Sequence, residues 1–230
     1  MNLVLPAPAP VAAPVEGGGL FPVHRIYCVG RNYAEHAQEM GHSGREPPFF
    51  FMKPADALVA VAAGETGAID YPSLTGNLHH EIELVVALGR GGRDIAAADA
   101  LACIWGYAVG LDMTRRDLQN DMKKQGRPWE IGKSFEQSAP IGPIVPIART
   151  GELTRGAITL DVNGTRKQTG DLAELIWNVA ETIEQLSRGW LLQPGDLIYT
   201  GTPAGVAAVQ RGDVMEGRID GLPALRVAVR

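Results

Sequence analysis

A run of mostly large apolar residues between positions 78 and 88, LHHEIELVVAL, gives a strong strand signal. A turn-like Thr-Gly-Asn precedes the run, a glycine follows it, and β-branched residues are frequent within it, so a buried strand is expected here. Side chains of a strand alternate between its two faces, which places His79, Glu81 and Glu83 on the same face. Two acids side by side on a buried strand require an explanation.

Placing the carboxylates of Glu81 and Glu83 side by side costs electrostatic free energy. Their Cα atoms are expected about 6.6 Å apart, and carboxylates that approach to roughly 4 Å repel by about 4 kcal/mol at an effective dielectric constant of 20. A hard divalent cation would offset this repulsion, because Mg²⁺ and Mn²⁺ prefer oxygen ligands. The alternative interpretation is a solvent-facing edge of an antiparallel strand, where two such acids are unremarkable.

Two helices are predicted in the first half of the chain from their end signals. One is expected to begin at Asn32, with Glu35 at capping-box spacing, and to end at Gly41. On this helix His36 and Glu39 are three residues apart and therefore neighbours. Asp94 is expected to cap a second, Ala-rich helix that follows it.

Two further helices are predicted in the second half. Thr114 and Asp117 have capping-box spacing, which favours a purely structural role for Asp117. Asp171 is expected to cap a long amphipathic helix that ends at Gly189, because apolar residues recur between them at helical spacing.

Short strands outnumber these helices. They are expected over residues 21–30, 49–54, 105–112 and 197–201, with a hairpin over residues 158–169 that turns at Asn163-Gly164. The pattern predicts a mixed α/β, β-dominated fold with a few peripheral helices. A single domain is expected over residues 20–230, preceded by a Pro/Ala/Gly-rich arm over residues 1–19 that is extended or mobile.

Composition narrows the partners. The 230 residues are 45% hydrophobic and 20% charged, as in globular proteins, and the formal net charge is −5 without a dense run of Lys and Arg, so no nucleic-acid partner is expected. No stretch of 18 apolar residues and no secretion signal occur, which predicts a cytoplasmic protein without a membrane partner. Cys28 and Cys103 are far apart and flanked by apolar residues, so both are expected as buried free thiols in a reducing compartment.

Other polar side chains suggest a site near the strand at 105–112. Asp112 stands at its end, where strands deliver functional groups. Arg115 and Arg116 fall in the first turn of the next predicted helix, where the helix dipole disfavours cations. An anionic ligand would explain them, and a surface ion pair is the alternative.

Six ordered blocks along residues 20–230 resemble the fumarylacetoacetate hydrolase family, most closely its small acylpyruvases. They are GRNYAEHAQEMG, PPFFFMKPADALV, LHHEIELVVALG, GLDMTRRDLQ, GRPWEIGKSF and LIYTGTPAGV. The resemblance implies a β-roll fold, a homodimer, and Mg²⁺ or Mn²⁺ held by Glu81, Glu83 and Asp112. His79 is then expected beside the ligands and not among them.

The activity that this resemblance implies is metal-dependent hydrolysis of the C–C bond of 3-acylpyruvates, above all fumarylpyruvate to fumarate and pyruvate. His36, oriented by Glu39, would activate a water molecule, and Lys133 would stabilise developing negative charge. Residues 36–46 are expected to order with substrate. Contacts to the small-molecule substrate are expected from Arg31, Arg45, Arg116, Gln119, Thr200, Gly201 and Thr202.

Two points stay open at the level of sequence. The carboxylate at the far end of fumarylpyruvate needs a cation away from the metal, and Arg45 and Arg115 are the candidates, with a surface role as the alternative for each. The same scaffold could also support oxaloacetate decarboxylation, or decarboxylation and isomerisation of 2-oxo diacids. A non-catalytic binding protein is a third reading, which the full set of polar site residues disfavours.

Overall fold

The computed structural model describes residues 3–33 and 45–230. An eight-stranded sheet contains β4 (Phe49–Lys53), β3 (Ile26–Gly30), β15 (Leu197–Tyr199), β8 (Ile82–Leu88), β9 (Ile104–Leu111), β11 (Ala139–Ile141) and β5 (Leu58–Ala60) in that order, with β12 (Val145–Pro146) paired to β9. A five-stranded sheet has the order β14 (Thr165–Asp171), β13 (Ala157–Val162), β17 (Val214–Ile219), β18 (Leu225–Val229) and β6 (Thr66–Ile69).

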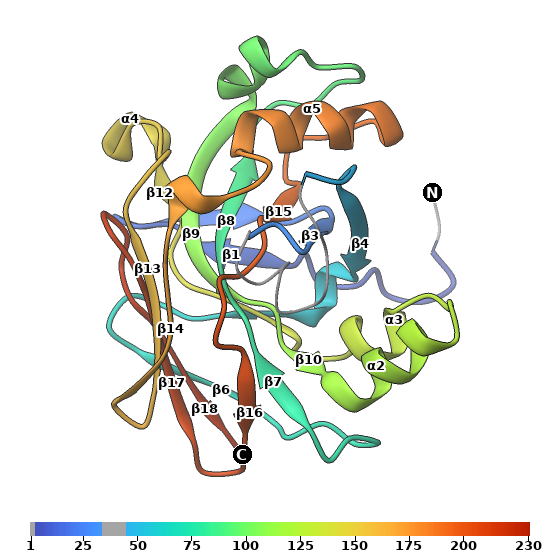
Figure 1. Cartoon of the computed structure of the whole chain (residues 1–230). Helices are drawn as coiled ribbons and strands as arrows, with labels where there is room; N and C mark the ends of the chain where they lie inside the picture. Colours follow the sequence, from blue (N-terminus) through green and yellow to red (C-terminus); the bar gives the residue numbers. More distant parts are fainter. Residues whose placement is uncertain (1–2, 34–44) are drawn as a thin grey trace.

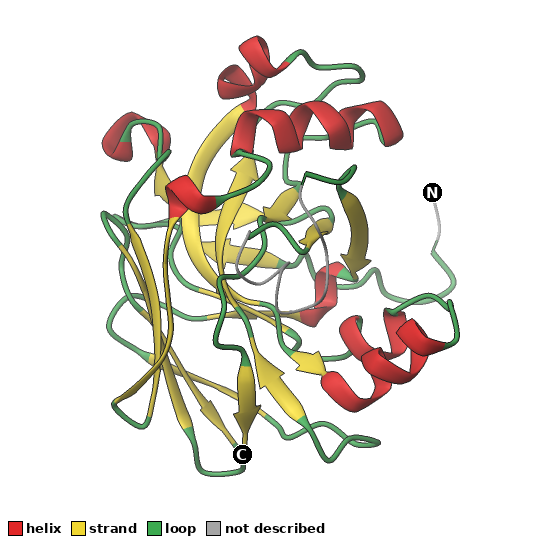
Figure 2. Ribbon diagram, in the orientation of Figure 1, coloured by secondary structure: helices red, strands yellow, loops and turns green. Residues whose placement is uncertain are grey.

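Two small sheets complete the β-structure. One pairs β10 (Thr114–Arg115), β7 (Leu78–His80) and β16 (Ala207–Val209), and the other pairs β1 (Ala12–Pro14) with β2 (Leu20–Pro22). The helices are short: α2 (Arg116–Lys124), α3 (Glu130–Lys133), α4 (Ile147–Thr150), α5 (Val179–Gly189), and the 3₁₀ turns η1 (Ala55–Ala57), η2 (Ala97–Cys103) and η3 (Leu172–Glu174). The expected β-dominated fold with a few peripheral helices is confirmed (Figure 2).

The large core lies between the two main sheets. The five-stranded sheet packs through β13 and β17 against β8 and β9, and α2 and α3 lie on the opposite side of the molecule from it (Figure 1). Buried apolar side chains from both sheets form one cluster that includes Ile82, Leu84, Val109, Leu160 and Met215. Strands β8 and β9 are therefore rigid supports for whatever their ends carry.

The predicted strand over residues 78–88 is divided in two. β7 ends at His80 and β8 begins at Ile82, so Glu81 stands at the junction, and the two strands belong to different sheets. Both strands pair with antiparallel neighbours, but only β8 continues into the eight-stranded sheet. This division, which alternation alone did not predict, opens the sheet next to the two acids.

The predicted starts of three helices were wrong, and the first two are the helices expected at Asp94 and at Thr114. Asp94 caps nothing, because η2 begins at Ala97 and its N-cap is Ala96. Thr114 lies in β10, and Asp117 instead accepts hydrogen bonds from Thr75 and the backbone of Gly76 and Leu118.

The predicted long helix from Asp171 to Gly189 is interrupted. Asp171 caps only the single turn η3, and Asn178 forms a second capping box that starts α5. The hairpin is confirmed, with Asn163 and Gly164 both at positive φ as a tight turn requires. The helix expected from Asn32 to Gly41 lies almost wholly outside the described residues.

The remaining sequence predictions concern the termini and the thiols. Ala12–Pro14, within the predicted arm, pairs with Leu20–Pro22, and Ala13 is fully buried. Cys28 and Cys103 are buried free thiols, as expected. None of the helices in the described part of the chain is long and apolar enough to cross a membrane. The division into arm and domain stays a prediction.

Gly110 gives a test of this packing, because it faces Glu83 across the β8–β9 pair. A Cβ at Gly110 would lie 2.7 Å from Tyr199 Cε1 and closer still to Val85. We expect Gly110→Ala to lower the free energy of unfolding by about 1–3 kcal/mol, the usual cost of overpacking a core, in urea denaturation. Gly189→Ala is the control, since a Cβ there meets nothing within 4 Å; an equal loss in both variants would contradict the packing argument.

Candidate metal centre and active-site cleft

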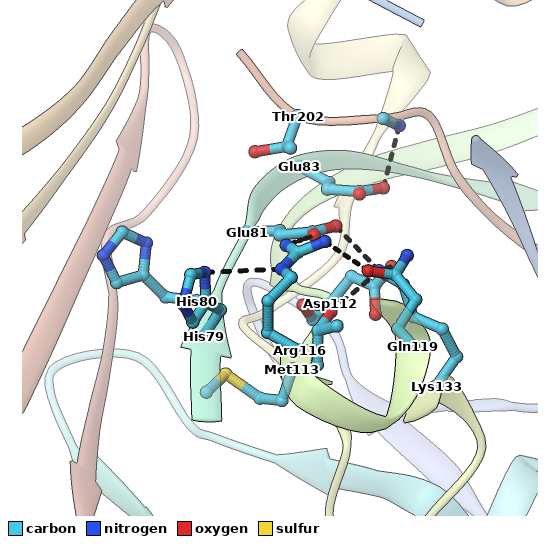
Figure 3. A network of polar contacts seen from close by, with 12 residues as sticks. His79, His80, Glu81, Glu83, Asp112, Met113, Arg116, Gln119, Lys133 and Thr202 are labelled. Atoms are coloured by element: carbon cyan, nitrogen blue, oxygen red, sulfur yellow. Dashed lines mark hydrogen bonds and ion pairs between the residues drawn. The ribbon is translucent and has the colours of Figure 1, made fainter. Parts of the chain in front are cut away.

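Three acids from neighbouring strands meet at the break between β7 and β8. Glu81 occupies the break, Glu83 lies in β8, and Asp112 follows the last residue of β9. The backbone N–H of Asp112 donates to the Glu81 carbonyl at 2.9 Å, which keeps the two strand ends in register. Each acid offers a carboxylate oxygen within 4.8 Å of the other two, and all three side chains are buried (Figure 3).

Buried cations surround two of these acids. Lys133 Nζ lies 2.8 Å from Glu81 Oε2 and 2.6 Å from Asp112 Oδ2, and it also donates to Thr114 Oγ1 at 2.7 Å. Lys53 Nζ lies 2.9 Å from Asp112 Oδ1, and Arg116 pairs with Glu81. Burial lowers the pKa of Lys133, but the carboxylates of Asp112 and Glu81 outweigh it, so the pKa is raised and the amine is charged.

Glu83 is held differently. Its Oε2 accepts the backbone N–H of Gly201 at 2.8 Å, and no ion pair reaches it from residues 3–33 or 45–230. Burial first, and then the charges of Asp112 and Glu81, raise the pKa of Glu83 well above its usual range. A cation placed among the three acids would remove this penalty by favouring the ionised carboxylate.

A hard divalent cation fits this donor set. All three candidate ligand atoms are carboxylate oxygens, which suit Mg²⁺ and Mn²⁺ and not softer metals. The site also faces an open cleft, so positions for water or a ligand are available beside the protein donors. The two sequence features that suggested a metal, the paired glutamates and the strand-end aspartate, are thus brought together.

The cleft is lined by the acids and by polar side chains. The lining includes five residues predicted to act on the substrate: Arg31, Arg116, Gln119, Lys133 and Thr202. Arg116 donates to Gln119 and to Glu81, and its Nε lies 3.4 Å from His79 Nδ1 (Figure 3). Burial and then the charge of Arg116 lower the pKa of His79 to about 4, so this ring is neutral.

The turn at residues 200–202 presents fewer donors to the cleft than predicted. The Thr200 hydroxyl donates to the Leu84 carbonyl at 2.9 Å. The Gly201 N–H is engaged by Glu83, so it supports a carboxylate of the protein. Thr202 is the member of this turn that lines the cleft.

Two predicted arginines lie elsewhere. Arg45 pairs with Glu181 and stacks 4.3 Å from the centre of the Trp177 ring. Arg115 stacks 4.4 Å from the centre of the Phe135 ring and is buried there. Neither lines the cleft.

Part of the predicted catalytic machinery cannot be placed. His36 and Glu39 fall outside the described residues, as does most of the segment 36–46 that was expected to order with substrate. Their roles in water activation stay predictions from the sequence.

An aromatic vestibule, which the sequence pattern did not predict, lies beside the cleft. It is lined by Arg31, Phe49, Phe50, Phe51, Arg127, Pro128, Trp129 and Glu130. Arg31, Phe51 and Trp129 line both spaces, so the vestibule adjoins the cleft. The run of three phenylalanines in β4 was a signal that could have indicated such a wall.

Lys53 was also missed. Its side chain is buried, and it donates to the backbone carbonyls of Met113 and Lys133 as well as approaching Asp112. A lysine within an otherwise apolar strand was the available signal, because a buried amine requires an anionic partner.

Comparison with known proteins agrees with this geometry. Residues 25–230 match the family model described as fumarylacetoacetate hydrolase C-terminal. The chain is 46% identical over 185 residues to a fumarylpyruvate hydrolase of Ralstonia, covering 80% of this chain and 93% of that protein. It is 41% identical over 204 residues to a mitochondrial oxaloacetate tautomerase of Rattus norvegicus, covering 89% and 90%.

A solved structure gives the same result. The fumarylpyruvate hydrolase of Pseudomonas aeruginosa, crystallised in complex with Mn²⁺ and pyruvate, superposes with a TM-score of 0.97 at 58% identity and covers 99% of each chain. The family model spans most of the sequence, and the fold agrees from end to end. The chain belongs to the fumarylacetoacetate hydrolase family.

Proposed function

We propose that this protein is a hydrolase that requires Mg²⁺ or Mn²⁺ and cleaves the C–C bond of 3-acylpyruvates, with fumarylpyruvate as substrate and fumarate and pyruvate as products. The observation that carries the proposal is the buried group of Glu81, Glu83 and Asp112 on a cleft that Lys133 and Arg116 also line. The fumarylpyruvate hydrolases among the relatives support the choice of substrate.

The three acids would hold the cation, and the neighbouring side chains would hold the substrate. When bound, a divalent cation would attract electron density from the oxygens of a 2-oxo acid and thereby weaken the bond that breaks. Arg116 and Gln119, adjacent on the wall of the cleft, would donate to the substrate carboxylate. Lys133 would stabilise negative charge on the pyruvate part as the bond between C3 and C4 breaks.

Hydrolysis also needs an activated water molecule. We propose that His36, oriented by Glu39, removes a proton from this water, as the sequence analysis anticipated. The hydroxyl group then adds to the acyl carbon, the C3–C4 bond breaks, and C3 gains a proton to give pyruvate. Water is the only co-reactant that this step requires.

A second function has specific support. Oxaloacetate tautomerases from several organisms are about 40% identical to this chain, and moving a proton on oxaloacetate would use the same carboxylates and Lys133. A related alternative, expected from the family resemblance, is decarboxylation of oxaloacetate, or decarboxylation and isomerisation of a 2-oxo diacid. Among the relatives, fumarylpyruvate hydrolases reach higher identity, so hydrolysis is the first candidate.

Formation of a homodimer and location in the cytoplasm are the finer parts of this proposal. Buried free thiols at Cys28 and Cys103 fit a reducing compartment. Sedimentation velocity of the purified protein would count against the dimer if it returned a single species of monomer mass.

A substrate panel tests the proposed function. We expect the protein loaded with Mg²⁺ or Mn²⁺ to release pyruvate from fumarylpyruvate faster than from maleylpyruvate or acetylpyruvate, and to act more slowly on oxaloacetate. The control is Glu83→Gln, which keeps the shape of the side chain but removes its charge. It should weaken Mn²⁺ binding in calorimetry by more than the roughly 10–100-fold that loss of an outer contact costs. Faster turnover of oxaloacetate would favour the second function.

Lys133 and His36 should separate chemistry from metal binding. Lys133→Met removes a cation that competes for two carboxylates, so we expect Mn²⁺ binding in calorimetry to persist or tighten while kcat for fumarylpyruvate falls by roughly 10²–10³. His36→Ala should reduce hydrolysis by roughly 10²–10⁴ and leave Mn²⁺ binding unchanged. Loss of Mn²⁺ binding in either variant would assign that residue to the metal centre instead.

Substrate choice is expected to depend on Arg31, because it lines both the cleft and the vestibule. Its guanidinium lies 5.4 Å and 5.6 Å from the ring centres of Phe49 and Trp129, which would hold it beside a flat acyl arm. We expect Arg31→Met to raise KM for fumarylpyruvate by roughly 10–150-fold, the value of a charge-assisted hydrogen bond, and to spare acetylpyruvate.

The matched control for this test is Arg45→Met, which removes an arginine outside the cleft lining. Its steady-state kinetics should resemble those of the wild type with both substrates. If Arg45→Met and not Arg31→Met shifted the preference, the distal carboxylate would be bound by Arg45, one of the two candidates that the sequence offered.

A further inference from the structure

Gln168 is a fully buried amide in β14, a strand of otherwise mostly exposed polar residues. Its Oε1 accepts the backbone N–H of Ile82 at 3.1 Å and lies 2.9 Å from His80 Nδ1. Its Nε2 donates to Thr202 Oγ1 at 2.8 Å and to the Pro203 carbonyl at 2.9 Å. Both acceptor positions and both donor hydrogens of the carboxamide are therefore used.

The orientation of this carboxamide follows from its partners. A backbone N–H can only donate and a backbone carbonyl can only accept, so Oε1 must face Ile82 and the amide nitrogen must face Pro203. His80 then donates from Nδ1, which fixes the tautomer of its ring. A flipped amide would lose both backbone hydrogen bonds, because the Ile82 N–H cannot accept and the Pro203 carbonyl cannot donate.

The four partners lie at the two places that shape the metal centre. Ile82 stands between Glu81 and Glu83, where β7 ends and β8 begins. Thr202 and Pro203 follow Gly201, whose N–H holds the Glu83 carboxylate. One side chain of a different sheet thus connects the segment that carries two of the acids with the loop that orients one of them.

The loop is also pressed closely against β14. A Cβ at Gly170 would lie 2.7 Å from Pro203 Cβ, and a Cβ at Gly205 would lie 3.4 Å from Gln168 Cα and closer still to the Lys167 carbonyl. The glycines at positions 170 and 205 therefore allow the loop to lie close enough to β14 for the Gln168 side chain to bond to it. In Figure 3 the Thr202 hydroxyl oxygen is turned away from Glu83, toward the side of the strand on which His80 lies.

We propose that Gln168 is a positioning residue of the metal centre, which sets the placement of the Glu83 carboxylate relative to Glu81 through Ile82 on one side and the 201–203 loop on the other. The inference rests on the proposed binding of a divalent metal to these acids. Without the carboxamide, the Ile82 N–H and the Pro203 carbonyl would lose buried partners, and the loop that holds Glu83 would no longer be tied to the strand break.

The experiment measures Mn²⁺ binding by calorimetry and the paramagnetic resonance spectrum of the bound ion. Gln168→Met fills the space without hydrogen bonds, and we expect Mn²⁺ affinity to fall by about 10–100-fold, as is usual for groups that orient metal ligands, with a changed spectrum. Ser187→Ala is the control for general destabilisation. Ser187 is fully buried in α5, where it accepts from the Ile95 N–H and donates to the Glu184 carbonyl; its removal should lower Tm and leave Mn²⁺ affinity unchanged.

A second pair of variants covers the case in which Gln168→Met does not fold. Thr202→Val removes the hydroxyl that Gln168 holds, whereas Thr202→Ser keeps it, so only the valine variant should bind Mn²⁺ more weakly than the wild type. Wild-type Mn²⁺ affinity in Gln168→Met, or in Thr202→Val should the first variant not fold, would overturn the proposal. Absence of Mn²⁺ binding by the wild-type protein would instead overturn the proposed function, which keeps the two failures distinct.

Discussion

Crowding of three buried carboxylates is the constraint on which the site depends. Glu81, Glu83 and Asp112 lie close enough to share one ion and are almost inaccessible to water. Each would lose solvation on folding, and their mutual repulsion adds to that loss. Lys53, Lys133 and Arg116 offset part of the charge. The charge of Glu83 is not offset in this way by an ion pair within the described residues, and burial and the neighbouring acids raise the pKa of Glu83 well above its usual range. A divalent cation would favour the ionised form of this carboxylate.

The scaffold holds this unfavourable arrangement because the acids sit on strands that the core immobilises. β8 and β9 are the central strands of the larger sheet, and the second sheet packs on them. The break at Glu81 then frees one end of the pair to line a cleft. Side-chain amides replace the missing backbone contacts there: Gln168 bonds to Ile82, and Asn32 bonds to the Thr200 carbonyl on the other side of the same loop. Hydrogen bonds from these two amides thus hold the strand break and the loop on either side of Glu83.

The cleft has mostly polar walls and the vestibule has largely aromatic walls, so the two spaces suit different parts of a hydrolase substrate. The three acids, Lys133 and Arg116 line the cleft, where the proposed function puts the 2-oxo acid. Phe49, Phe51 and Trp129 line the vestibule, where the proposed function puts the acyl arm, and Arg31 lines both spaces. Aromatic walls favour a flat conjugated group, and a cation beside them favours one with a terminal carboxylate.

The sequence by itself determined the β-dominated fold, the strand position of Glu83 and the strand-end position of Asp112, because alternation and turn residues are local signals. The six family blocks added the expectation that these acids share a metal. Tertiary structure alone decided that the 78–88 strand breaks at Glu81, that Lys53 pairs with Asp112, and that Gln168 bonds from another sheet to Ile82, between two of the acids. Lys53 and Asp112 are 59 positions apart and Gln168 and Ile82 are 86 positions apart, and no periodicity within one segment encodes such contacts. The helix ends predicted at Asp94 and Asp117 were wrong for a related reason. Both residues are good helix caps by type, but Asp117 accepts hydrogen bonds from Thr75 and Gly76, which lie far away in the sequence.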